Sequence, residues 1–167
     1  MKVRFSLFLL CVCIIAGSVQ ASGQKLYPVQ GPAATQTPPK VFTAKIKKGM
    51  VSEQISGFVT DGEELQGKIA TITASAMNSK KPGDTDSYPP QQNLAFAWDA
   101  IYGQGFYLSH VLGEEIGQGV FTGNQGTVLQ VEYVVENFGK LSQAYKAYGV
   151  AVDNKGNVYK MISPIPF

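Results

Sequence analysis

This chain has few of the residues from which metal centres, nucleophilic sites and nucleic-acid interfaces are built. It has one histidine, His110, and two cysteines, Cys11 and Cys13, which lie in the first thirteen residues. Its one arginine is Arg4. A zinc site usually takes several Cys or His ligands, and a nucleic-acid binder usually shows a basic stripe with arginine forks. We therefore expect no metal, no cofactor and no nucleic-acid partner.

Both cysteines belong to a segment with the layout of a secretory signal peptide. The first four residues include two basic side chains, residues 5–16 are largely apolar, and Val19-Gln20-Ala21 precedes Ser22 as a cleavage point. The apolar run is too short to span a membrane. We expect a signal peptide at residues 1–21, cleavage after Ala21, and no transmembrane segment in the mature chain.

Without its leader the chain would be formally neutral. Removing Lys2 and Arg4 from the 14 basic residues leaves 12, against 12 acidic residues. The mature chain would hold no cysteine, and it has no Asn-x-Ser/Thr acceptor. Eukaryotic secreted domains often carry disulfides or such acceptors. These absences favour a bacterial protein that is periplasmic or secreted.

The most informative feature that is present is an internal repeat. Residues 119–131 and 149–161 align at a spacing of thirty residues and share the pattern Gly-Val-x-x-x-Asn-x-Gly-x-Val. Asn followed two residues later by Gly suits a type I turn with a G1 bulge, and apolar residues alternate after each turn. The repeat predicts two equivalent β-hairpins. Their structural turn residues are Asn124, Gly126, Asn154 and Gly156.

The remaining patterns predict one β-rich domain. Residues 22–40 are rich in Pro, Gln, Thr and Gly, and we expect a flexible lead-in there. The globular domain is expected at 41–163, with a long polar loop at 78–92 and a C-terminal tail at 164–167. The predicted fold class is mainly β (α+β), as an antiparallel sheet or a small sandwich or barrel with one helix.

The helix is expected at residues 93–112, although a strand stays an alternative. Apolar residues from Leu94 to Leu112 follow helical spacing, with Asn93 as an N-cap. Leu94, Phe96 and Trp98 would also suit a strand, and two glycines weaken a helix.

His110 is the one candidate for acid–base catalysis. Asp99 and Glu114 are close to it in sequence, and on one continuous helix His110 and Glu114 would lie four residues apart on one face. The alternative is a structural histidine near a helix C-terminus, where its charge is stabilised. We favour the structural interpretation and keep His110, Glu114 and Asp99 as catalytic candidates.

The aromatic residues indicate binding more than catalysis. Trp98, Tyr102 and Tyr107 have amphipathic rings that could line a face for a glycan, peptide or protein ligand. The main prediction is an exported bacterial envelope protein that acts as a non-catalytic binding or interaction module. One alternative is an inhibitor or immunity factor against an envelope-acting enzyme. The other is a small hydrolase that uses His110 with a nearby carboxylate.

Overall fold

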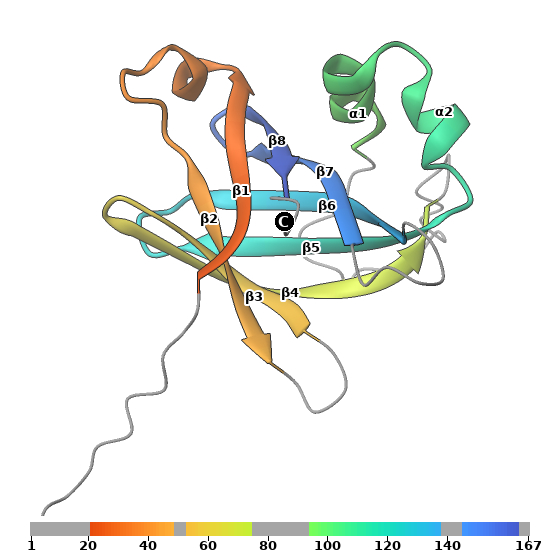
Figure 1. The fold of residues 1–167 in the computed structure, drawn as a ribbon. Coiled ribbons are helices and arrows are strands. Elements are labelled where there is room, and N and C mark those ends of the chain that lie inside the picture. The colour runs from red at the N-terminus through yellow and green to blue at the C-terminus, as the bar shows by residue number, and fades with distance from the viewer. Residues whose placement is uncertain (1–20, 49–52, 75–93, 138–144, 164–167) are drawn as a thin grey trace, which may run out of the picture.

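Eight strands close into an antiparallel barrel in the computed structural model of this chain, which describes residues 21–48, 53–74, 94–137 and 145–163 (Figure 1). Each strand pairs with the next one along the chain, and β8 pairs with β1 to close the sheet. The strands are β1 (Ala21–Gln30), β2 (Phe42–Lys48), β3 (Glu53–Thr60), β4 (Glu63–Thr73), β5 (Glu115–Gly123), β6 (Val128–Asn137), β7 (Tyr145–Asp153) and β8 (Val158–Ile162). The helices are the 3-10 helix η1 (Pro32–Thr35), α1 (Ala95–Tyr102) and α2 (Phe106–His110). The prediction of a mainly β, antiparallel fold is confirmed.

The barrel begins earlier in the chain than the sequence pattern suggests. Residues 22–40, expected to form a flexible lead-in, instead contain most of β1 and all of η1. The composition of this segment does not indicate a strand, because Leu26 is the one fully buried apolar residue among the described side chains of β1. The pairs of β1 with β2 and β8 correct the expected lead-in. Residues 1–20, the loop expected at 78–92 and the tail expected at 164–167 lie outside the described residues.

The two copies of the internal repeat form equivalent hairpins. Gly126 and Gly156 have φ of 82° and 80°, a region that glycine enters without a Cβ clash. The Gly126 N–H donates to the Gly123 carbonyl at 3.1 Å, and the Gly156 N–H donates to the Asp153 carbonyl at 3.2 Å. The prediction of two hairpins with glycine at the same corner of each turn is confirmed.

The repeated asparagine joins each turn to the neighbouring hairpin. Asn124 Oδ1 accepts the Glu64 N–H at 3.2 Å, and Asn154 Oδ1 accepts the Val128 N–H at 3.0 Å. The backbone N–H groups of the same two asparagines donate to the carbonyls of Glu64 and Val128. Because these bonds link successive turns, the repeat builds one end of the barrel as a single unit. We call it the closed end: the β3–β4, β5–β6 and β7–β8 turns with η1.

Buried polar side chains fill the closed end. Asp153 accepts hydrogen bonds from the Tyr159 hydroxyl at 2.9 Å and from the Asn157 side-chain amide at 2.8 Å. Asn157 Oδ1 accepts the Ala33 N–H of η1 at 2.7 Å, which fixes η1 across this end. Burial and the Asp153 carboxylate both raise the pKa of the Tyr159 hydroxyl, so it remains a neutral donor. Each of these buried polar groups has a partner, as burial requires.

Apolar side chains form two separate layers, one on each face of the sheet. The inner layer fills the barrel and includes Leu26, Phe42, Phe58, Phe121 and Tyr159. The outer layer lies on β5, β6 and β7 beneath the helices, and it includes Trp98, Tyr107, Ile116, Val134 and Val150. Because both faces of these three strands are covered, outward positions there are not solvent positions.

The segment between β4 and β5 is helical, as expected, but it forms two short helices. Gly103 and Gly105 have φ of 115° and 77°, so the chain leaves the right-handed helical region between α1 and α2. The division lets α1 pack on β7 and lets α2 turn back beside it (Figure 1). The expected single helix over residues 93–112 is corrected in this respect, and Asn93 lies outside the described residues.

Candidate functional site

The aromatic candidates Trp98 and Tyr102 lie together, but they pack against other side chains. The Tyr102 and Phe106 rings stack with centroids 4.8 Å apart, and the Phe106 and His110 rings stack at 4.5 Å. The Lys160 ammonium group lies 4.9 Å from the centroid of the Tyr102 ring. Trp98 is fully buried, with its ring 6.0 Å from that of Phe106. These contacts hold α1 and α2 together and against β8.

Asp99 and Tyr107 have structural roles where α1 meets α2. Asp99 accepts the Tyr107 N–H at 2.9 Å and the Gly105 N–H at 3.1 Å, so its two oxygens cap the start of α2. Tyr107 itself is buried in the outer layer. His110 is exposed at the last residue of α2, and Glu114 follows after that helix has ended. The helical pairing of His110 with Glu114 therefore does not form.

Glu132 fixes α1 on the outside of the barrel. Its carboxylate accepts hydrogen bonds from the Gln118 side-chain amide at 2.9 Å, the Trp98 indole N–H at 2.9 Å and the Leu94 N–H at 3.3 Å. Only 1% of Glu132 is exposed. Its outward position in β6 follows from the alternation of the strand, but α1 covers that position.

At the end of the barrel opposite the turns, inward-facing positions of the described strands are exposed. Ile69 and Tyr133 pack against the inner layer, and Thr71 and Val135 continue the same faces of β4 and β6. Thr71 is nevertheless exposed and Val135 is 50% exposed. Pairing of β3 with β4 ends at Gly57 and Gln66, so the inner face of β4 beyond Gln66, where Thr71 lies, is accessible to solvent. We call this end, where Thr71, Tyr133 and Val135 lie, the mouth.

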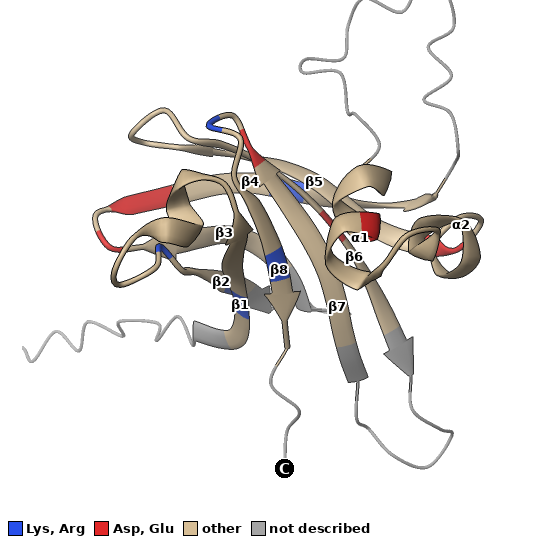
Figure 2. Cartoon of the chain, turned by 90° about the horizontal axis from the view of Figure 1, so that it is seen from above, with Lys and Arg blue, Asp and Glu red and all other residues tan. Residues whose placement is uncertain are grey.

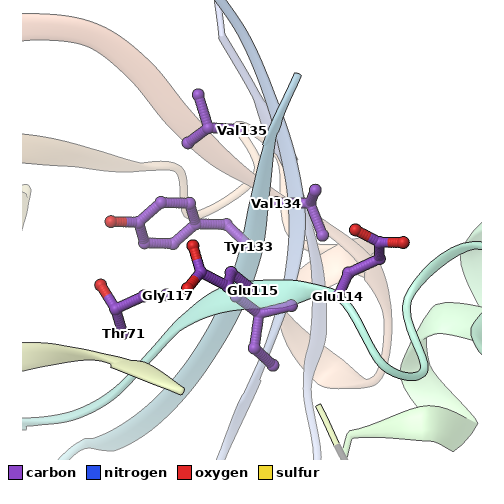
Figure 3. A pocket seen from close by; sticks show the side chains of 8 residues that line it. Thr71, Glu114, Glu115, Gly117, Tyr133, Val134 and Val135 are labelled. Carbon is purple, nitrogen blue, oxygen red and sulfur yellow. The ribbon is translucent and has the colours of Figure 1, made fainter. Parts of the chain in front are cut away.

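A pocket lies in the mouth where β5 separates from β6. Pairing between these strands ends at Gly117 and Tyr133, whereas β5 stays paired with β4 as far as Glu115. The pocket has a volume of about 420 Å³ (Figure 3). Its lining residues are Thr71, Glu114, Glu115, Ile116, Gly117, Tyr133, Val134 and Val135. Since the lining includes both inner-layer and outer-layer residues, the pocket joins the barrel interior to the helical layer.

Tyr133 is the largest side chain in the pocket, and Gly117 makes room for it. A Cβ atom at Gly117 would lie within 3.0 Å of Cε1, Cζ and Oη of Tyr133, which means that the ring lies directly across β5. Burial raises the pKa of the Tyr133 hydroxyl, so at neutral pH it is an uncharged donor and acceptor. Figure 3 shows the hydroxyl groups of Tyr133 and Thr71 on the same side of β5.

Sequence reasoning found one of these lining residues as a site candidate, Glu114, and assigned it to catalysis. It missed Gly117, Tyr133 and Thr71 as parts of one site. Glycines at alternate positions of a strand, as at Gly117 and Gly119, mark a place where another group approaches the backbone closely. That signal was present, but only the strand register shows which aromatic ring approaches.

Comparison of the chain with protein-family models, curated proteins and solved structures found no match. In the part of the chain that the structure describes, no helix is long and apolar enough to cross a membrane.

Proposed function

We propose that this protein is an exported, non-catalytic binding protein that takes a small ligand with polar and apolar groups in the mouth of its barrel. The observation that carries the proposal is the exposure of inward-facing Thr71 and Val135 beside a pocket of about 420 Å³. Small-molecule sites are commonly concave, with volumes of about 300–1,000 Å³, and the volume of this pocket lies in that range.

The asymmetry of the barrel supports the same function. The closed end is held by hydrogen bonds between turns and by buried polar side chains such as Asp153 and Asn157. The mouth carries apolar, hydroxyl and carboxylate groups around a hollow. A rigid base with an open, mixed lining at the other end is suited to holding a ligand in one orientation.

The contacts of the catalytic candidates favour packing over a hydrolase. Asp99 uses both carboxylate oxygens to cap α2, and His110 stacks on Phe106. The export part of the proposal rests on the basic and apolar leader pattern that ends at Ala21.

The binding proposal is tested with a neutral, environment-sensitive fluorophore, N-phenyl-1-naphthylamine. We expect saturable fluorescence enhancement with a Kd on the order of 10–100 μM, as for other fragment-sized ligands. Thr71→Phe places a ring in the mouth and should weaken binding at least about tenfold, because it fills the pocket. Ala70→Phe is the matched control, since Ala70 is equally exposed but lies on the opposite face of β4.

Unfolding curves of both variants establish that each is folded. Equal affinity of the two variants and the wild type, or enhancement that does not saturate, would contradict binding in the mouth.

A further inference from the structure

We infer that the ligand of the mouth is an amphiphilic organic cation: an ammonium-type head group on an apolar body. This inference rests on the proposed binding function and adds the charge of the ligand to it.

The charged side chains that line the pocket are both acidic. Glu114 and Glu115 contribute two carboxylates, and the remaining polar side chains of the lining are the neutral hydroxyls of Thr71 and Tyr133. Figure 3 shows the Glu114 and Glu115 carboxylates on opposite sides of β5. A cationic head group beside either carboxylate would be attracted to it, and a carboxylate or phosphate group there would be repelled.

The segment that provides most of the pocket lining carries no positive charge. Residues 94–137, which include α1, α2, β5 and β6, hold five acidic residues and no lysine or arginine. Figure 2 shows acidic colouring on α1 and basic colouring on β8, where the Lys160 ammonium group lies 4.9 Å from the centroid of the Tyr102 ring. In β4, Lys68 is exposed and alternates with the inward-facing Ile69, so it lies on the outer face. A cation in contact with the lining itself would therefore meet acidic and neutral side chains.

The remaining lining suits the apolar body of such a ligand. Ile116, Val134 and Val135 provide an apolar wall, and the Tyr133 ring has a π face that attracts cations.

The test compares three ligands with the same ten-carbon chain: decylammonium, decanol and decanoate. Each displaces N-phenyl-1-naphthylamine at pH 7, below its micellar concentration. Each exposed carboxylate should raise the affinity for a cation by roughly twofold and lower the affinity for an anion by roughly twofold. Two carboxylates should therefore make the affinity for decylammonium higher than that for decanoate by on the order of tenfold. The affinity for decanol should lie between those for decylammonium and decanoate. The preference should shrink in about 0.5 M salt, where exposed charges are screened.

Glu115→Gln and Glu114→Gln should each reduce the preference of the cation over the anion by about threefold to fourfold. Asp61→Asn is the matched control, because it removes one exposed negative charge from the β3–β4 turn at the closed end and should leave the preference unchanged. Equal displacement by decylammonium and decanoate, or a preference that Asp61→Asn lowers as much as Glu115→Gln does, would overturn the cation inference while leaving the binding site in place. Loss of fluorophore binding to the wild-type protein would instead refute the proposed function itself.

Discussion

The substitution Gly117→Ala tests whether the Tyr133 ring packs across β5 at the mouth. The alanine Cβ would lie within 3.0 Å of three atoms of the Tyr133 ring, a separation that real Cβ atoms essentially never show. Gly117 does not have positive φ, so its backbone accepts alanine without strain. The ring is only partly buried and borders the open mouth. We therefore expect Gly117→Ala to displace Tyr133 toward solvent while the fold is retained.

The cost follows from the surface that the ring would expose. Moving a half-buried tyrosine ring out of contact exposes roughly 60–80 Å² of apolar surface, which is worth about 1.5–2 kcal/mol at 25 cal/mol per Å². Insertion of a methyl group into a packed site typically costs about 1–3 kcal/mol, which agrees. Tyr133→Ala alone should cost about 2 kcal/mol, and Gly117→Ala should then add almost nothing. The coupling between the two changes should be about 1.5 kcal/mol.

The assay is urea unfolding of both single variants and the double variant, followed by far-UV circular dichroism. Gly119→Ala is the control, because its Cβ would meet the main-chain oxygen of Lys68, which removal of Tyr133 cannot clear. Its cost should persist in the Tyr133→Ala background. Additive costs of Gly117→Ala and Tyr133→Ala, or a stable Gly117→Ala protein, would refute the proposed packing of the ring across β5.

Two further predictions concern the hairpins and the leader. Gly126→Val and Gly156→Val should each lower stability by about 1–2 kcal/mol, because a Cβ there meets no atom within 4 Å and the cost is backbone strain alone. Unfolding melts should give values within about 1 kcal/mol of each other. Gln125→Ala and Lys155→Ala should cost less, about 0.5 kcal/mol, since each loses one hydrogen bond to a neighbouring turn. Mass spectrometry of protein exported by a bacterial host should show a mature N-terminus at Ser22, and a retained leader would contradict export by this signal.

The hairpins could be predicted because their signal is local. Asn124 and Gly126 determine a turn through their own backbone preferences, and the strand after them alternates with a period of two. The same signal recurs at Asn154 and Gly156, so two separate stretches of the sequence predicted the same hairpin turn. Helical structure between β4 and β5 also followed from local spacing, and it divides at Gly103 and Gly105, the two glycines that weaken a helix in the sequence.

The first strand and the site could not be predicted because both depend on distant partners. β1 has one fully buried apolar residue, Leu26, and it becomes a strand by pairing with β2 and with β8 from the far end of the chain. Glu132 alternates outward as expected, but its burial depends on α1. The pocket exists because β5–β6 pairing stops at Gly117 and Tyr133, and no sequence pattern states where two strands separate.

The barrel has two different ends, and this explains why the internal repeat stabilises the closed end while the candidate site lies at the mouth. Each copy of the repeat places its turn, its asparagine and its positive-φ glycine at the closed end, where successive turns bond to one another. Because the closed end fixes the register of these strands, they need fewer stabilising contacts at the mouth. The mouth can therefore hold an inward glycine, an exposed threonine and two carboxylates, which add little to stability. On this argument, substitutions at Asn154 or Gly156 should act mainly on unfolding, and substitutions at Thr71 or Glu115 mainly on ligand affinity.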